Sequence, residues 1–154
     1  MESVALFGYS GHTFVVADAI NQIGYKLIGY YDKNESKTNP YNLKYLGDVN
    51  NEVALSIISE SGASFSVSIG DNSIRRIVIQ HLNKKGFVIA LIVHPASTVS
   101  KLATNGIGSF VAAVAVVNPL AKIGLGAIIN TSAVVEHECI IGITHTLLRG
   151  CSCW

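Results

Sequence analysis

The sequence predicts an α/β unit followed by a parallel β-solenoid, and two observations carry this prediction. The first is a sixfold repeat in the C-terminal third, where an aliphatic side chain returns at every sixth position. The aliphatic series is Val111, Val117, Ile123, Ile129, Val135, Ile141 and Leu147. A second, mostly small series follows the first six of these by four residues: Ala115, Ala121, Ala127, Ala133, Cys139 and His145. The second observation is the alternation of apolar strand-like runs with helical patterns over residues 1–94.

A period of six predicts a chain that turns a corner every six residues. An α-helix would distribute such positions around its circumference, whereas short strands joined at corners stack them into one column. Three six-residue faces then form one triangular coil, with the aliphatic and small positions inside. Ordinary buried strands are the alternative, but they alternate with period two and do not keep phase through Pro119, Gly124 and Gly126. We expect the solenoid over residues 95–147, with two coils between 111 and 146.

The N-terminal pattern predicts a small parallel sheet with crossover helices. The expected strands cover residues 4–7, 27–31, 63–69 and 87–93. A first helix ends at Gly24, a second covers 51–61, and residues 33–50 form a polar linker. The apolar face of a third helix is expected from its spacing to carry Ile74, Ile77, Val78, His81 and Leu82.

The composition excludes several classes of function. A net charge of +1 gives no electrostatic case for nucleic acid or an anionic membrane as partner. The most apolar run, residues 110–117, is much shorter than the roughly 20 residues that span a bilayer. The first residues have no basic flank and only a brief apolar run, so we expect no signal peptide. Three cysteines indicate a reduced, cytoplasmic protein. A charged fraction of 14% predicts a buried solenoid face or a subunit interface.

Two glycine turns, at residues 8–12 and 69–72, follow expected strands at the same edge of the sheet. The helix after the first turn offers its N-terminus to a phosphate, and Ser10 and His12 add side-chain donors. Asp32 lies about 20 residues further on, where an acid that binds a ribose is expected. The turn lacks the full G-x-G-x-x-G spacing, so a plain glycine turn with a loop-capping aspartate is the alternative. Two turns together favour a nucleotide or nucleotide-sugar pocket.

The third helix also carries two adjacent arginines, Arg75 and Arg76. Either side chain could face a diphosphate. A solvated helix face is the expectation for both.

His137, between Glu136 and Glu138, is the one densely titratable spot in the solenoid. It lies two residues past the inward Val135, so we expect it to point outward. An imidazole beside a carboxylate is a candidate general base, because the acid fixes the tautomer and stabilises the imidazolium. The alternative is an ordinary surface histidine. A metal site of His137, His145, Cys151 and Cys153 matches no common zinc spacing, so we expect no metal.

Four motifs together resemble the hexapeptide acyltransferases that act on sugars. The sialic acid O-acetyltransferases and the UDP-4-amino-sugar N-acetyltransferases of bacillosamine synthesis are the nearest in kind. The motifs are Gly-Tyr-Ser-Gly-His at 8–12, Ile-Gly-Asp-Asn-Ser-Ile-Arg at 69–75, His-Pro at 94–95 and Asn-Thr-Ser-Ala-Val-Val-Glu-His-Glu-Cys at 130–139. The resemblance implies a Rossmann-like domain over 1–94 for the nucleotide sugar and a left-handed parallel β-helix that forms a homotrimer and uses acetyl-CoA.

The resemblance also implies roles for particular residues. His137 would take the proton from the acceptor, and Glu138 would raise its basicity. The residues that would hold the sugar nucleotide are Ser10, Gly11, His12, Asp32, Lys33 and Gly70. His145 resembles a second histidine that contacts the acetyl donor, but it stands at the small position of the column. Residues 148–154 lose the repeat, so we expect a truncated β-helix with an out-of-register tail, as a frameshift after Gly142 would produce.

The leading hypothesis is therefore an acetyltransferase. Acetyl-CoA would donate its acetyl group to an amino or hydroxyl group of a nucleotide-activated or sialic-type sugar, and truncation would impair the activity. A non-catalytic nucleotide-sugar-binding remnant is the alternative. An NAD-dependent oxidoreductase is a third hypothesis, and the incomplete glycine fingerprint argues against it.

Overall fold

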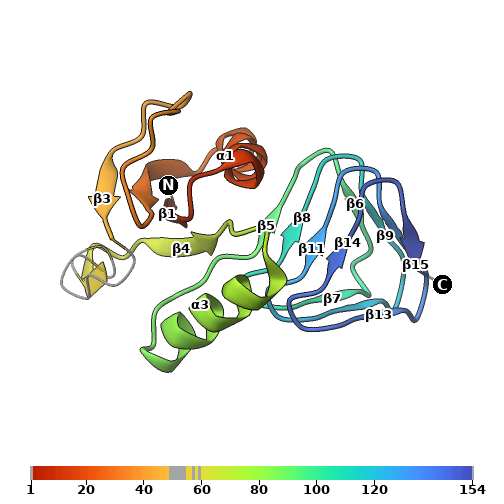
Figure 1. The fold of residues 1–154 in the computed structure, drawn as a ribbon. Helices are drawn as coiled ribbons and strands as arrows, with labels where there is room; N and C mark the ends of the chain where they lie inside the picture. Colours follow the sequence, from red (N-terminus) through yellow and green to blue (C-terminus); the bar gives the residue numbers. More distant parts are fainter. Residues whose placement is uncertain (1, 49–54, 57, 59, 154) are drawn as a thin grey trace.

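The computed structural model describes residues 2–48, 55–56, 58 and 60–153, and Figure 1 shows a small α/β unit packed beside a triangular prism. The expected helix at 51–61 falls mainly outside the described residues. The elements of the α/β unit are β1 (Ser3–Phe7), α1 (Gly11–Ile23), β2 (Lys26–Tyr31), β3 (Tyr45–Gly47), β4 (Ser64–Val67) and α3 (Asn72–Lys84). The prism begins with β5 (Ile92–Val93), β6 (Thr98–Val99), β7 (Thr104–Asn105), β8 (Phe110–Val111), β9 (Val116–Val117) and β10 (Lys122–Ile123). It continues with β11 (Ile128–Ile129), β12 (Val134–Val135), β13 (Ile140–Ile141), β14 (Thr146–Leu147) and β15 (Ser152–Cys153).

The α/β unit is a Rossmann-like parallel sheet with strand order β3-β2-β1-β4. The parallel pairing of β1 with both β2 and β4 confirms the predicted crossover topology. The first helix ends as predicted at Gly24, whose φ of 87° is left-handed and whose amide bonds back to the last turn. Strand β3 was not predicted. It lies in the segment expected to be a polar linker, and Tyr30 pairs with Tyr45 there.

The buried face of α3 differs from the prediction. Ile74 is 52% exposed and Ile77 is 66% exposed, whereas Arg75, Ile79 and Leu82 are buried at the helical spacing of four and three residues. The expectation of a solvated Arg75 is therefore wrong, although Arg76 is exposed as expected. The physical reason is that Arg75 donates hydrogen bonds to acceptors in the prism, and the spacing of apolar residues along the helix cannot predict such bonds.

The prism is a left-handed parallel β-helix built from three sheets, as predicted. Strands pair in parallel with strands 18 residues away, so three six-residue faces close one coil. The sheets have the orders β13-β10-β7, β14-β11-β8-β5 and β15-β12-β9-β6. The column inside the prism contains the two predicted series from Val111 to Ile141 and from Ala115 to Cys139, which are buried. His145, the last member of the small series, is exposed, so the expectation that it stands in the column is wrong.

Both expected ends of the solenoid are corrected. The strand expected at 87–93 is divided, because Ile89 bridges to Phe65 of the sheet whereas β5 already pairs with β8 of the prism. At the other end, Val134 pairs with Ser152 at the same 18-residue offset, so the residues expected to be out of register continue the coil. The 18-residue register is set by backbone hydrogen bonds, which tolerate the unusual side chains of this segment.

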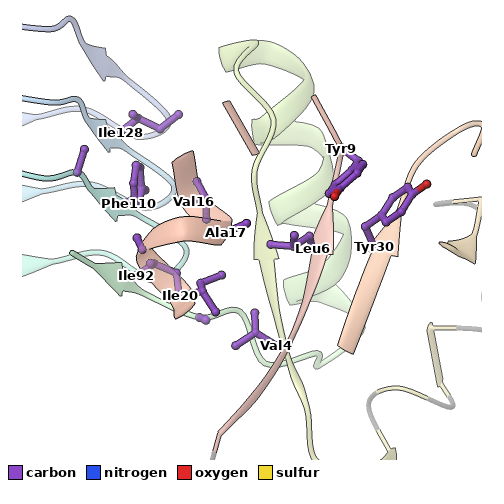
Figure 2. Close-up of a cluster of buried hydrophobic side chains, with 13 residues drawn as sticks. Val4, Leu6, Tyr9, Val16, Ala17, Ile20, Tyr30, Ile92, Phe110 and Ile128 are labelled. Atoms are coloured by element: carbon purple, nitrogen blue, oxygen red, sulfur yellow. The ribbon is translucent and has the colours of Figure 1, made fainter. Parts of the chain in front are cut away.

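The prism docks on the α/β unit through one face, the sheet β14-β11-β8-β5. Figure 2 shows Ile92, Phe110 and Ile128, one from each successive coil, facing the apolar side of α1. Their partners in α1 are Val16, Ala17 and Ile20. The same position in the next coil is Thr146, which does not extend the apolar column but bonds to Asn72 at 2.7 Å. One prism face is therefore apolar toward α1 and polar toward α3.

His12 lies at this docking surface. Its ring contacts Phe110 edge to face, with ring centroids 5.6 Å apart, and its Nε2 is buried without a hydrogen-bond partner. Burial lowers the pKa of His12 to about 4, and the charges of Arg75 and Arg149 act in the same direction. The imidazole is therefore neutral in the folded protein at neutral pH.

Replacing His12 by Asn should weaken the dependence of stability on pH. Below the ordinary pKa of 6.5 His12 binds a proton in the unfolded chain, whereas in the folded chain it binds one only near pH 4. The free energy of unfolding therefore falls as the pH drops from 6.5 to about 4. Between pH 7 and pH 5 the loss is about 1–2 kcal/mol. Urea unfolding at both pH values measures it, with the exposed His81→Asn as control. Equal pH dependence in the wild type and His12→Asn would contradict the assignment.

Candidate functional site

A pocket of about 570 Å³ opens at the carboxyl edge of the parallel sheet, where both glycine turns were expected to meet. Its lining consists of Gly8, Tyr9, Ser10, Asp32, Lys33, Ile69, Gly70, Asp71, Ile74 and Val78. Four of the predicted sugar-nucleotide residues, Ser10, Asp32, Lys33 and Gly70, are therefore gathered in one place. Gly11 begins α1 just behind Ser10, whereas His12 turns toward Phe110 and does not line the pocket.

The Asp32 carboxylate is held by backbone amides. Its Oδ2 accepts from the Tyr9 amide at 2.8 Å, and its Oδ1 accepts from the Lys33 amide at 2.6 Å. These bonds give Asp32 the loop-capping position that the alternative interpretation described, and they also fix the first glycine turn to the end of β2. Each oxygen keeps a second lone pair, so the carboxylate can still accept a hydrogen bond from a ligand hydroxyl.

Thr13 joins the two glycine turns, and the sequence analysis missed it. Its Oγ1 accepts from the Ser10 amide at 3.2 Å and lies 3.1 Å from the carbonyl oxygens of both Gly8 and Ser68. The side chain is fully buried. A threonine in the first helical turn is common at helix starts, so no signal in the sequence separated this one. It holds the start of α1, with its positive end, at the pocket.

The pocket also has an apolar wall formed by Ile69, Ile74 and Val78. Ile74 and Val78 lie on the side of α3 that the sequence assigned to the core. Their place in the pocket explains why the exposed side of α3 carries isoleucine and valine. The pocket thus combines backbone amides and a hydroxyl with an apolar surface, which is the usual composition of a small-molecule site.

His137 lies at the corner between β12 and β13, well exposed to solvent. The side chains of His137 and Glu138 are 72% and 70% exposed, and Nδ1 lies 3.3 Å from Glu138 Oε2. The outward placement expected from the repeat is found, with Val135 and Cys139 buried on either side. A proton on Nδ1 shared with Glu138 would leave Nε2 as the free base.

Two further contacts hold this corner. Glu136 accepts from the Asn118 side chain at 2.8 Å, one coil below. Glu138 has a left-handed backbone with φ of 62°, and its amide bonds to the Pro119 carbonyl at 3.2 Å. The side chain beside His137 is therefore presented by a fixed turn.

A groove of about 420 Å³ runs beside this corner over the sheet β13-β10-β7. It is lined by Leu102, Thr104, Leu120, Lys122, Glu138 and Ile140. Its apolar side chains are largely exposed, Ile140 at 69% and Leu102 at 65%. An apolar groove that includes Glu138 indicates a binding surface next to His137.

The structure does not bring all predicted site residues together. His137 lies at the corner between β12 and β13, which belong to the two sheets that do not dock on the α/β unit. The groove beside it shares no residue with the first pocket. His145 is exposed, between Thr144 and Thr146, at a third corner. Within the described part of the chain no three His, Cys, Asp or Glu side chains are placed to hold a metal ion, and no helix is long and apolar enough to cross a membrane.

Comparisons with known proteins show which family and which solved structures the chain resembles. The PglD N-terminal domain family matches residues 3–82, just over half of the 154 residues. The acetyltransferase domain of PglB from Neisseria gonorrhoeae, in complex with acetyl coenzyme A, is 28% identical with a TM-score of 0.88, and the match covers 98% of this chain and 72% of that one. A variant of GDP-perosamine N-acetyl transferase from Caulobacter crescentus, in complex with CoA and GDP-perosamine, is 29% identical with a TM-score of 0.89, covering 99% and 71%.

WeeI from Acinetobacter baumannii has the same fold, with a TM-score of 0.80 at 20% identity over 99% of this chain and 72% of that one. These matches confirm the resemblance drawn from the four sequence motifs. They also agree with the order of a Rossmann-like sheet followed by a hexapeptide β-helix. The chain belongs to the PglD N-terminal domain family and is a hexapeptide-repeat sugar acetyltransferase.

Proposed function

We propose that this chain transfers the acetyl group of acetyl-CoA to the amino group of a nucleotide-activated amino sugar, with His137 as general base. The observation that carries the proposal is the exposed His137–Glu138 pair at the rim of an apolar groove. The similar Caulobacter enzyme, whose structure contains CoA and GDP-perosamine, supports N-acetylation over acetylation of a sialic acid hydroxyl.

The transfer would proceed by direct attack. The sugar nitrogen attacks the thioester carbonyl, and Nε2 of His137 takes the proton that the nitrogen releases. Glu138, 3.3 Å from Nδ1, holds the tautomer and stabilises the imidazolium. As the C–S bond breaks, the imidazolium returns a proton to the departing thiolate. Backbone amides beside the reacting carbonyl would stabilise the oxyanion.

The first pocket would hold the nucleotide part of the acceptor. The N-terminus of α1, with Ser10 and Gly11, suits the diphosphate, because its amides and dipole favour negative charge. Lys33 adds a cation, and Asp32 accepts from a hydroxyl. The apolar wall suits the flat face of a base. Gly70 would allow the ligand to approach the backbone closely. His12, which is neutral, would not contact the ligand but would support the turn that contains Ser10 from behind.

A homotrimer is part of this proposal, because the first pocket lies in the α/β unit, whereas His137 lies at the corner between β12 and β13, whose two sheets do not dock on that unit. A neighbouring copy would pack beside the exposed groove of Leu102, Leu120 and Ile140, and it would bring its pocket toward His137. Light scattering should give three times the chain mass, and a fully active monomer would contradict the arrangement.

Free Cys139, Cys151 and Cys153 support a reducing, cytoplasmic location, which cell fractionation tests.

Acetyl-CoA would lie in the groove near Glu138 and reach toward His145. A binding titration with CoA tests this part against the alternative of a nucleotide-sugar-binding protein without catalysis. Uptake of UDP with no uptake of CoA would support that alternative.

Replacing His137 by Ala should lower kcat by about 10²- to 10⁴-fold, because the amine then has no positioned proton acceptor. Glu138→Gln should cause a smaller loss. The assay follows acetyl transfer to UDP-4-amino sugar, GDP-4-amino sugar and sialic acid, with the exposed His81→Ala as control. Unchanged acetylation by His137→Ala would remove the histidine from its role, and transfer to sialic acid alone would remove the amino sugar.

Replacing Ile74 by Ser should weaken nucleotide binding to the first pocket by about tenfold, because part of a buried isoleucine side chain is worth about 1–1.5 kcal/mol. Ile77→Ser is the matched control, since Ile77 is exposed on the same helix but does not line the pocket. Calorimetry with UDP and GDP measures the effect. Equal losses in the two variants would show that the wall does not contact the nucleotide.

A further inference from the structure

Arg75 is a fully buried arginine between the two parts of the molecule. Its guanidinium contacts six acceptors within 3.0 Å. Three belong to the segment at the end of the first pocket: Ile69 O at 2.8 Å, Gly70 O at 2.9 Å and Asn72 Oδ1 at 2.8 Å. Three belong to the prism: Gly126 O at 2.8 Å, Thr144 O at 2.7 Å and Thr146 Oγ1 at 3.0 Å. One side chain therefore divides its bonds equally between the pocket wall and the prism.

Because Arg75 is charged and buried, losing either set of acceptors would be costly. Among the described residues no carboxylate forms an ion pair with it, and burial lowers its pKa, with the charge of Asp71 opposing the shift. A buried guanidinium without a counterion is costly unless its five N–H groups are satisfied. If the prism moved away, half of the acceptors would be lost together. The docked geometry is therefore strongly preferred over any partly separated one.

The prism acceptors lie at one corner, where successive coils stack. Gly126 and Thr144 are left-handed residues with φ of 62° and 51°, 18 residues apart, and their carbonyl oxygens both face Arg75. A Cβ on Gly126 would collide with Ile79 Cδ1 of α3, so the glycine allows the helix to come this close. Close approach is what allows the guanidinium to reach both carbonyls.

Thr144 and Thr146 flank His145. The Arg75 Nη2 bonds to the backbone of one and to the hydroxyl of the other. The opposite nitrogen, Nη1, bonds to Ile69 and Gly70 of the nucleotide pocket. The guanidinium is thus the physical link between the pocket wall and the segment that holds His145.

We propose that Arg75 is a positioning residue that fixes the nucleotide pocket to the 144–146 segment, so that filling the pocket also orders this segment. This inference rests on the proposed function for the identity of the ligands. The link itself requires only the geometry of the guanidinium. Because a misplacement of about 1 Å costs about a hundredfold in rate, a loosened link should lower the rate of transfer more than the binding of nucleotide.

The test compares three full-length variants with the wild type. Arg75→Lys keeps the charge but has three donors and no planar fork, so it cannot reach both sets of acceptors. Thr146→Val removes one acceptor and keeps the shape of the side chain. Arg76→Met, at the exposed neighbouring position, is the control.

Amide hydrogen exchange is the readout that does not depend on catalysis. In the free protein, exchange at 144–146 should be at least about tenfold faster in Arg75→Lys than in the wild type. The 136–139 corner and Arg76→Met should be unchanged. UDP should slow exchange at 144–146 in the wild type and not in Arg75→Lys. Kinetically, Arg75→Lys should lose about tenfold or more in kcat with a smaller change in KM, and Thr146→Val should lie between.

Unchanged exchange at 144–146 in Arg75→Lys would overturn the proposal, and so would UDP that binds the wild type without slowing exchange there. Faster exchange spread evenly over the prism would also overturn it, since Arg75 would then serve general stability. If UDP does not bind but 144–146 still exchanges faster in Arg75→Lys, the link stands and the assignment of the pocket to a nucleotide fails.

Discussion

The 18-residue register of the prism is the constraint on which the rest of the structure depends. Backbone hydrogen bonds between consecutive coils fix this register, for example from the Lys122 amide to the Cys139 carbonyl. Once it is fixed, residues 18 apart stack on the same face, whatever their side chains are. The interior column makes the prism stable, and the exterior positions are free to differ from face to face. Function can therefore be placed on the outside without disturbing the interior.

The exterior faces and corners of the prism make different contacts. One face supplies Ile92, Phe110 and Ile128 to α1, and one corner supplies the carbonyl oxygens of Gly126 and Thr144 to Arg75. Another corner, between β12 and β13, carries His137 in the open. The α/β unit docks on one face of the prism, and this corner joins the other two faces.

The interior of the prism could be predicted from the sequence because a strict period leaves one geometrical solution. The parts that could not be predicted are those where a contact between residues far apart in the sequence decides burial, against the local spacing of apolar residues. Arg75 looked solvated because its three acceptors in the prism are 51 to 71 residues away in sequence. Ile74 and Ile77 looked buried because of their helical spacing, whereas Ile74 lines a pocket and Ile77 is exposed. Val114 and Leu120 adopt left-handed corners with φ of 60° and 64°, which no local preference of branched residues would suggest.

The first pocket contains two carboxylates, although its backbone suits an anionic ligand. Asp32 accepts from two amides at the first glycine turn, and Asp71 accepts from the Ser73 and Ile74 amides as the cap of α3. Each negative charge is therefore stabilised by oriented N–H groups. Arg75 lies buried behind the wall and Lys33 lines the pocket, so cations as well as carboxylates lie close to it. At a few ångströms the position of each charge decides the field, whereas the net charge of the chain decides it only at long range.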